Sequence, residues 1–464
     1  MQNFQSIFKN FDHIFSQKVI LITSFIISLY NAKEQVIHMS ILNFQSTKIA
    51  VIGMGYVGLP LAVALGEKWR TVGFDINGRR IKDLNSNIDS TGEVSELDFN
   101  NSKLVQFTDD AKYILDSNIY IVTVPTPITK NNLPNLNAIK SATKLISSII
   151  SDGDVVIYES TVYPGLTEEI CIPILEKENF KLNKNFFCGY SPERINPGDK
   201  THKLKDIVKV VSGSNEYALD LIDRLYSSII NAGVYRAQSI KVAEAAKVIE
   251  NTQRDLNIAL INELSIIFNK LDIDTQSVLD AASTKWNFNR FNPGLVGGHC
   301  IGVDPYYLTY KSKKAGYTPK IILGGRKLNN EMPAYVADQL IKSLVEQKKD
   351  PRHCKVLIMG FTFKENCPDI RNTKVINLHE ELLKRKLGVD IFDPNVNISE
   401  AKNQYGISLI AEPQKNCYHG VILAVPHDDF INPGPGFSQS FCRNDGIFFD
   451  LKGRFKIEES DFRL

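Results

Sequence analysis

One cysteine, Cys300, stands in a glycine-rich stretch that could present it to a ligand. The stretch reads GGHCIGVDP from residue 297, so Asp304 follows four residues after the cysteine. Glycines let a backbone approach a ligand closely. A thiolate held there could attack a carbonyl carbon, because the thiolate is the nucleophilic form of cysteine. A buried, unreactive cysteine is the competing interpretation. Adjacent residues rarely present both side chains to one site, so His299 is not assigned as a base.

A lysine and an amide could serve the same chemistry. Lys247 and Asn251 lie four residues apart in a helical pattern, so they project from the same face of the helix. Together they could hold a sugar hydroxyl and later stabilise an oxyanion. The alternative is an ordinary solvated helix face.

Two polar loops add further candidates. The segment YSPERINPGD follows an expected strand and contains Glu193, Arg194 and Asn196, although a decorated surface turn would look the same. The segment FTFKENCPDIR places the cations Lys364 and Arg371 around an expected helix start. That arrangement suits anionic phosphates, and a capping or ion-pair role is the alternative.

A dinucleotide-binding pattern lies nearer the beginning of the chain. The run KIAVIGMGYVGLP has glycines at 53, 55 and 58, and Asp75 closes the next apolar run 17 residues after Gly58. Such glycines permit a tight turn, close approach to a pyrophosphate and close helix packing, while the acid accepts ribose hydroxyls. The acid favours NAD over NADP, because it would repel the 2′-phosphate of NADP. The neighbouring pair Arg79-Arg80 could instead attract that phosphate and so opposes this inference.

Composition bounds the class of protein. The 464 residues exceed one ordinary core, and 54 basic against 52 acidic residues give a formal net charge of +2, which does not suggest nucleic-acid binding. The seven cysteines are scattered without a CxxC or Cys/His cluster, so we expect neither a disulfide framework nor a metal site. A cytoplasmic protein is expected.

Residues 1–46 are interpreted as an extension outside the fold. The apolar run at 19–30 has 12 residues, too few to span a bilayer. Met39 is a candidate true start, and a membrane anchor is the alternative. We expect no membrane association.

The alternation of apolar strands and helical patterns predicts an α/β protein with parallel sheets covered on both faces. We expect two Rossmann-like, doubly wound domains joined by a long central helix over 239–270. The expected divisions are 47–238 for NAD binding, 239–350 for a central helical domain with the cysteine loop, and 351–464 for the last domain. Expected strands of the first sheet are 48–53, 71–75, 104–107, 118–124, 154–159, 186–189, 207–211 and 233–236. Loops at 124–127 and 159–165 should face the cofactor crevice.

Seven blocks of the sequence resemble one family. They are GMGYVGLP, VPTP, ESTVYPG, SPERINPGD, KVIEN, PGLVGGHCIGVDPYYL and GFTFKENCPDIRNT, in order from about residue 47 to the end. This set is similar to the UDP-glucose/GDP-mannose dehydrogenase family of nucleotide-sugar 6-dehydrogenases. The resemblance implies that two NAD molecules in turn accept hydride while a sugar 6-hydroxyl becomes a carboxylate. It also implies that residues 351–464 bind the UDP-sugar.

The resemblance also implies roles for individual residues. Cys300 would form a thiohemiacetal and then a thioester, with Lys247, Asn251 and Asp304 around the reacting oxygen. Glu193 and Thr161 would assist proton transfer and thioester hydrolysis. The implied cofactor contacts are Gly53, Gly55, Tyr56, Val57, Gly58, Asp75, Arg80, Thr126, Thr161 and Arg371. The implied substrate contacts are Glu193, Arg194, Asn196, Lys247, Asn251, Arg290, Gly297 and Lys364. No metal is implied.

Substrate choice depends on one position. UDP-glucose dehydrogenases typically carry a second glutamate four residues after the position of Glu193, where this chain has Pro197. The sequence therefore looks like the subgroup acting on UDP-N-acetylhexosamines, with Arg290 as a candidate for an arginine that some members have before PGLVGG. We expect oxidation of the 6-hydroxyl of a UDP-N-acetylhexosamine. We also expect a homodimer, and a product that serves as a uronic acid precursor of a surface polysaccharide. The alternatives are UDP-glucose, then GDP-mannose, and a catalytically silent NAD and nucleotide-sugar binding protein.

Overall fold

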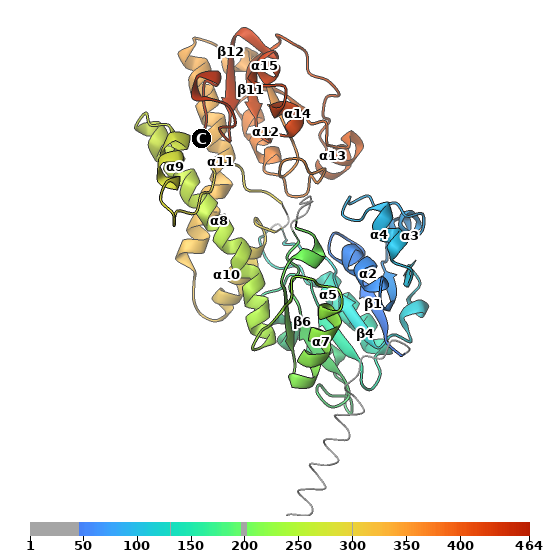
Figure 1. Ribbon diagram of the computed structural model, residues 1–464. Coiled ribbons are helices and arrows are strands. Elements are labelled where there is room, and N and C mark those ends of the chain that lie inside the picture. The colour runs from blue at the N-terminus through green and yellow to red at the C-terminus, as the bar shows by residue number, and fades with distance from the viewer. Residues whose placement is uncertain (1–45, 130, 196–201, 299) are drawn as a thin grey trace, which may run out of the picture.

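Two lobes are joined by long helices that run along one side of the molecule (Figure 1). The computed structural model describes residues 46–129, 131–195, 202–298 and 300–464. The apolar run at 19–30 lies outside the described residues. No described helix is long and apolar enough to cross a membrane.

The N-terminal lobe contains an eight-stranded sheet in the order β3-β2-β1-β4-β5-β6-β7-β8. Its strands are β1 (Lys48–Ile52), β2 (Arg70–Phe74), β3 (Val105–Thr108), β4 (Ile119–Val122), β5 (Val155–Tyr158), β6 (Phe187–Tyr190), β7 (Lys209–Gly213) and β8 (Val234–Arg236). All eight expected strands are confirmed to within two residues at each end. The helical elements of this lobe are α2 (Gly58–Gly66), α3 (Gly78–Asn85), α4 (Glu96–Asn101), η1 (Ala111–Ile114), α5 (Asn137–Ile149), the π-helix η2 (Thr167–Cys171), α6 (Ile172–Leu175), η3 (Leu204–Asp206) and α7 (Glu216–Ser227).

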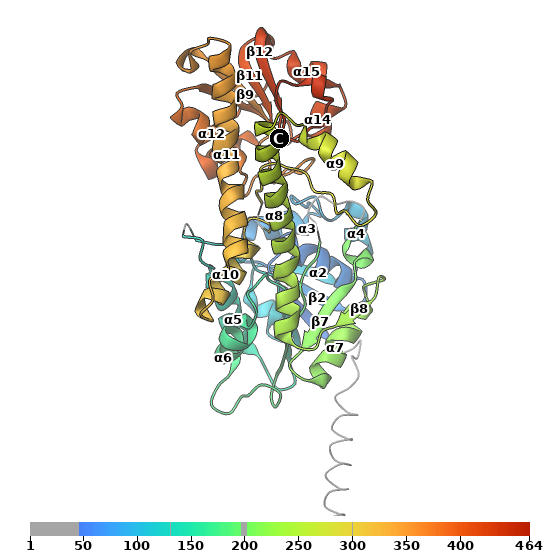
Figure 2. The ribbon, with the colours of Figure 1, turned by 90° about the vertical axis from the view of Figure 1, so that its left-hand side faces the viewer.

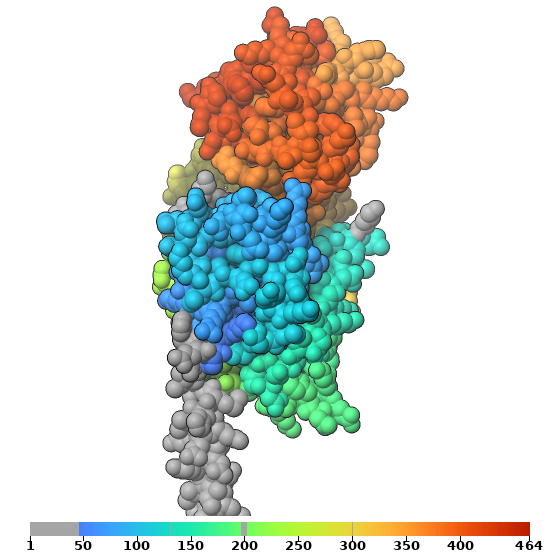
Figure 3. All heavy atoms as spheres, turned by 90° about the vertical axis from the view of Figure 1, so that its right-hand side faces the viewer, coloured from blue at the N-terminus to red at the C-terminus, as the bar shows by residue number. Residues whose placement is uncertain are grey.

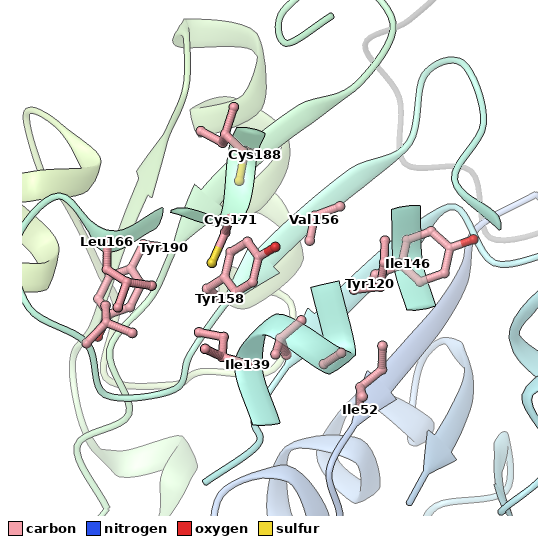
Figure 4. Packing of buried hydrophobic residues seen from close by; sticks show 14 of the residues in the cluster. Ile52, Tyr120, Ile139, Ile146, Val156, Tyr158, Leu166, Cys171, Cys188 and Tyr190 are labelled. Atoms are coloured by element: carbon pink, nitrogen blue, oxygen red, sulfur yellow. The ribbon is translucent and has the colours of Figure 1, made fainter. Parts of the chain in front are cut away.

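Buried apolar residues on both faces explain why these strands form the centre of the lobe. Figure 4 shows one of the two clusters, where Ile139 and Ile146 of α5 pack near Val156 and Tyr158 of β5. The Tyr158 hydroxyl remains paired inside the core, 3.0 Å from the hydroxyl of Thr143. Continuous apolar runs of this kind are typical of parallel strands covered on both sides.

The expectation of a wholly parallel first sheet was wrong at one position. Strands β6 and β7 are antiparallel, with Gly189 opposite Gly213 and Tyr190 opposite Ser212, while β7 and β8 are parallel to each other. A parallel pair needs a crossover, usually a helix. Between β6 and β7, the described part of the chain forms only the three-residue η3, so the chain reverses direction there.

Two long helices form the central part of the molecule. Helix α8 (Ile240–Lys270) begins after Ser239, whose side chain caps it, and its 31 residues confirm the expected long helix. Helix α11 (Lys320–Glu346) lies beside α8, and both extend into the two lobes (Figure 2). The shorter helices α9 (Thr275–Ser283) and α10 (Asp304–Lys314) lie between them in sequence.

The C-terminal lobe has a parallel sheet in the order β10-β9-β11-β12. Its strands are β9 (Lys355–Met359), β10 (Gly388–Phe392), β11 (Tyr418–Leu423) and β12 (Cys442–Asp450), and its helical elements are η4 (Pro351–His353), α12 (Val375–Lys384), α13 (Ile398–Tyr405), α14 (Asp428–Ile431), α15 (Pro435–Gln439) and η5 (Ile457–Glu459). The expected fold class, two α/β domains joined by a long helix, is confirmed. Helix α12 begins four residues later than the expected Arg371, because Asn372 has a left-handed φ of 52° that a helix cannot contain.

Candidate active site

A cavity of about 240 Å³ lies where helix α8, the loop after β6, the cysteine loop and the C-terminal lobe meet. Its polar lining combines five cations with one carboxylate. These charged residues are Arg194, Lys247, Glu250, Arg254, Lys364 and Lys452. Cys300, Asn251 and Gly297 line the same cavity. An excess of cations around a thiol suits a phosphorylated ligand that carries a reactive carbonyl group.

The cysteine loop depends on glycines because it is packed closely against the C-terminal lobe. A Cβ atom at Gly297 would lie 2.7 Å from the carbonyl oxygen of Asn372, and Gly298 has a left-handed φ of 86°. The backbone N–H of Asp304 donates to the carbonyl of Cys300 over 2.8 Å, so the loop turns directly into α10. Cys300 itself is half-buried and lines the cavity.

The polar residues predicted around the reacting oxygen lie together. The side-chain amide of Asn251 donates to Asp304 Oδ2 over 2.6 Å, and Asp304 is 1% exposed. One turn earlier on α8, Lys247 Nζ donates to the backbone carbonyl of Glu193 over 2.7 Å. Lysine and amide N–H groups therefore lie on one face of α8, toward the cysteine loop.

Glu193 is buried, and its carboxylate is held by several donors. Oε1 accepts from the backbone N–H groups of Arg194 and Ile195 at 2.6 and 2.7 Å, and Oε2 accepts from Lys209 Nζ at 2.8 Å. Burial acts to raise the pKa of Glu193, but attraction to Lys209 and these hydrogen bonds outweigh it and lower the pKa below its ordinary value. Glu193 is therefore held as an anion next to the cavity.

The glycine-rich loop after β1 has the shape that a dinucleotide requires. Gly53 has a left-handed φ of 103°, and a Cβ atom at Gly58 would lie 1.8 Å from the Gly53 carbonyl oxygen. At Gly55, by contrast, an added Cβ would meet no heavy atom within 4 Å, so this backbone is open to close approach. The three glycines thus fit the turn, pyrophosphate and packing roles of an NAD-binding loop.

Asp75 and Arg80 lie beside this loop and are both engaged with it. Asp75 Oδ2 accepts from the backbone N–H of Met54 over 2.7 Å. Arg80 donates to the Met54 carbonyl over 2.9 Å and forms an ion pair with Asp89 at 2.8 Å. Arg80 is therefore tied to its own chain, which weakens its candidacy as a 2′-phosphate ligand.

The loops after β4 and β5 meet, as expected for the carboxyl edge of the sheet. Thr126 Oγ1 donates to the carbonyl of Thr161 over 2.7 Å. Tyr307 of α10 donates to the Thr126 carbonyl over 2.9 Å, which links this edge to the helix that follows the cysteine loop.

Arg371 joins the lobes. Its guanidinium carbon lies 4.6 Å from the centroid of the Tyr56 ring in the glycine-rich loop, and its NH2 group pairs with Asp369 at 2.6 Å. Figure 3 shows the C-terminal lobe lying directly above the blue part of the N-terminal lobe, which begins at residue 46. The resemblance implied that Arg371 reaches the cofactor of its own or of a neighbouring chain, and in this chain the guanidinium lies against Tyr56 of its own glycine-rich loop.

Other predicted residues are not brought to the cavity. Arg290 pairs with Asp280 and with Gln276, 3.0 Å away, and it is absent from the described residues that line the cavity. Asn196 and His299 lie outside the described residues.

Sequence reasoning missed Arg254, Glu250 and Lys452. Arg254 lies seven residues after Lys247 on α8, so helical spacing could have found it. Lys452 comes from the last part of the chain and carries no local signal.

Comparisons with known proteins identify relatives that are dehydrogenases of nucleotide sugars. Models of the UDP-glucose/GDP-mannose dehydrogenase family match the chain in three parts: the NAD binding domain over 47–230, the central domain over 241–331 and the UDP binding domain over 357–456. A UDP-N-acetyl-D-glucosamine 6-dehydrogenase of Pseudomonas aeruginosa is 53% identical over 418 residues, covering 90% of this chain and 99% of that protein. A protein of the same name from Salmonella typhi is 52% identical, covering 90% and 98%.

Solved structures give the same fold. The UDP-D-ManNAc dehydrogenase of Pyrococcus horikoshii superposes with a TM-score of 0.78 at 26% identity, covering 89% of this chain and 96% of that one. An NDP-N-acetyl-D-galactosaminuronic acid dehydrogenase of Methanosarcina mazei Go1 has a TM-score of 0.76 at 25% identity, covering 89% and 92%.

Proposed function

This chain belongs to the UDP-glucose/GDP-mannose dehydrogenase family of NAD-dependent oxidoreductases, and from that premise we propose that it oxidises the 6-hydroxyl of a UDP-N-acetylhexosamine to a carboxylate. The observation that carries the proposal is a half-buried thiol, Cys300, in one cavity with Lys247 and Asn251. Relatives more than 50% identical over most of the chain are named for UDP-N-acetyl-D-glucosamine, which supports this substrate class.

The residues of the cavity suit an oxidation that passes through a bound aldehyde. Bound NAD would supply the hydride acceptor, held by the Gly53–Gly58 turn and Asp75. Lys247 and Asn251 would donate to the sugar oxygen as negative charge grows on it. Asp304 fixes the Asn251 amide, which leaves the second amide N–H for the ligand.

Cys300 retains the intermediate in our proposal. Its thiolate adds to the aldehyde carbon, and the oxygen takes a proton to give a thiohemiacetal. Loss of a second hydride and that proton gives a thioester. Water then cleaves the carbon–sulfur bond, which releases the carboxylate and restores the thiol. Glu193 lies beside this region as an anion, and Thr161 is on the cofactor side, so both are proposed to assist the proton transfers.

The cations of the cavity are proposed to bind the diphosphate of the substrate. Arg254 has no ion-pair partner within the described ranges, and Lys364 comes from the C-terminal lobe. Arg194 forms an ion pair with Glu250 at 2.6 Å, so these two residues add no net positive charge to the cavity. UDP-glucose is ranked second, because this chain has Pro197 where UDP-glucose dehydrogenases typically carry a second glutamate.

We further propose a cytoplasmic homodimer that supplies uronic acid precursors for a surface polysaccharide. Helix α8 exposes apolar side chains along its length, among them Ile249 at 54% and Leu260 at 53%. An exposed apolar stripe on a long helix is typical of a surface that pairs with another copy.

Four parallel assays test which nucleotide sugar the protein oxidises. The purified protein is incubated with NAD and UDP-GlcNAc, UDP-GalNAc, UDP-glucose or GDP-mannose, and NADH and the uronic acid are quantified. We expect two NADH per acid formed and the highest kcat/KM with a UDP-N-acetylhexosamine. Tight binding of NAD and UDP-sugar without NADH would favour the silent binding protein, and preference for UDP-glucose would overturn the substrate assignment.

A further inference from the structure

A buried lysine outside the cavity pairs with two carboxylates, which lie in the loops that follow two different strands. Lys209, the first residue of β7, is 2% exposed. Its ammonium lies 2.9 Å from Glu159 Oε2 and 2.8 Å from Glu193 Oε2, and it donates to the Pro192 carbonyl over 3.3 Å. Its three N–H donors therefore have three acceptors, which is what a buried ammonium needs in order to remain charged.

The two carboxylates are not equivalent. Glu159 follows β5 and accepts a hydrogen bond from the hydroxyl of Tyr226 on α7, whose ring centroid is 5.2 Å from Lys209 Nζ. Burial raises the pKa of Glu159 to about 7, with attraction to Lys209 opposing and repulsion from Glu193 adding to the shift. The pKa of Glu193 moves the other way, below its ordinary value, as described above. The two shifts run in opposite directions, so Glu159 is the more easily protonated of the two carboxylates.

Glu193 connects this cluster to the cavity. Its carbonyl oxygen accepts from Lys247 Nζ over 2.7 Å, and its carboxylate is bound to the backbone N–H groups of Arg194 and Ile195. On the cavity side the charged neighbours are Lys247 and the Arg194–Glu250 pair. Lys247 lines the same cavity as Cys300, so the placement of its ammonium there depends on how the Glu193 loop is held.

We propose that Lys209 is a positioning residue for the oxidation: its ammonium fixes the Glu193 carboxylate as an anion and thereby holds the loop whose carbonyl orients Lys247. Glu159 balances the charge of Lys209 in this buried cluster. This inference rests on the proposed function, because it assigns Lys209 an effect on Glu193 and Lys247 during turnover.

The test uses a double variant that leaves the net charge of the buried cluster unchanged. Lys209→Met alone leaves two buried carboxylates without a cation, so the main variant is Lys209→Met combined with Glu159→Gln, which removes one charge of each sign. The amide oxygen that Glu159→Gln introduces can still accept from Tyr226. Lys205→Met is the surface control, since Lys205 pairs with Glu67 at 2.7 Å and lies away from the cavity.

The measurement is the pH profile of kcat, with KM for the UDP-sugar that the wild-type enzyme turns over. In the double variant we expect the acidic limb to move up by about one pH unit, because Glu193 loses a cation at 2.8 Å. We expect kcat at neutral pH to fall by about tenfold or more and KM to change by less than about threefold. Glu159→Gln alone keeps the Lys209–Glu193 contact, so its acidic limb should stay at the wild-type position.

Each other outcome has a defined meaning. An unmoved acidic limb and wild-type kcat in the double variant would overturn the role of Lys209. So would the same shift in Glu159→Gln alone, which would assign the effect to Glu159. Loss of folding in the double variant, measured by NAD binding and thermal unfolding, would make Lys209 a residue of the fold only. A wild-type protein that oxidises none of the sugars would instead count against the proposed function.

Discussion

Arg371 lies over the ring of Tyr56, 4.6 Å from guanidinium carbon to ring centroid, although the two residues belong to different lobes. A planar guanidinium can stack on a ring and still donate hydrogen bonds at its edge, which an ammonium cannot do. The pair therefore connects the C-terminal lobe to the loop that would hold the cofactor phosphates.

This contact predicts an effect on cofactor affinity. Arg371→Lys keeps the charge but loses the stacking, so we expect KM for NAD to rise about tenfold with a smaller change in kcat. Tyr56→Phe keeps the ring and should behave nearly as wild type, whereas Tyr56→Ala should resemble Arg371→Lys. Steady-state kinetics with NAD as the varied substrate measure this. An unchanged KM in Tyr56→Ala would show that the contact is incidental.

Cys300→Ser should separate binding from turnover. The serine has a similar shape, so folding and the binding of NAD and UDP-sugar should survive. Because its hydroxyl is a much weaker nucleophile, formation of the acid should fall by about a thousandfold or more. Acid formation by mass spectrometry and NAD affinity by calorimetry measure the two effects. Cys417→Ser, at another half-buried cysteine, is the matched control. Wild-type acid production by Cys300→Ser would exclude the covalent mechanism.

Cofactor preference should follow Asp75. Its carboxylate is fixed by the backbone N–H groups of Met54 and Asn77 at 2.7 and 2.9 Å, and it would repel a 2′-phosphate. We expect kcat/KM with NAD to exceed that with NADP by about a hundredfold, and Asp75→Asn to narrow the ratio. The ratio of the two kcat/KM values is the readout. Equal use of both cofactors by the wild-type enzyme would direct attention to the exposed Arg79.

A buried carboxyl far from the cavity predicts how stability depends on pH. Asp154, the residue before β5, is 5% exposed, and its Oδ2 accepts from the Ser151 N–H over 2.8 Å. Burial raises the pKa of Asp154 to about 6, with the Ser151 hydrogen bond opposing and the nearby Asp152 adding. Because the folded state favours the protonated form, this group stabilises most below its unfolded pKa of about 4, and that stabilisation is lost as pH rises to about 6.

Asp154→Asn keeps an acceptor oxygen and removes this titration. Relative to wild type, we expect the variant to gain about 1–2 kcal/mol of unfolding free energy between pH 4 and pH 7. Urea or thermal unfolding across this range measures the difference, with Asp152→Asn as the control at the neighbouring carboxylate. A difference that shrinks as pH rises would contradict the assignment.

Local sequence pattern predicted most of the strands because their apolar runs are buried on both faces, as in 48–52 and 119–122. The direction of β7 could not be predicted, since an apolar run does not encode its direction. Lys247 and Asn251 were found because four-residue spacing places them on one helix face. The Lys209 cluster was missed because Glu159, Glu193 and Lys209 are brought together only by sheet topology.

The reversal between β6 and β7 determines which end of β7 lies at the carboxyl edge of β5 and β6, where the active site is. Parallel strands offer that edge only the residues that follow them, as β5 offers Glu159 and β6 offers Glu193. Because β7 runs the other way, with Tyr190 opposite Ser212, its opening residue is carried to the same edge. Had β7 been parallel, Lys209 would lie at the far edge of the sheet, and the two carboxylates would face each other without a cation. Strand β7, which runs opposite to β5 and β6, thus supplies the positive charge that those two strands cannot deliver.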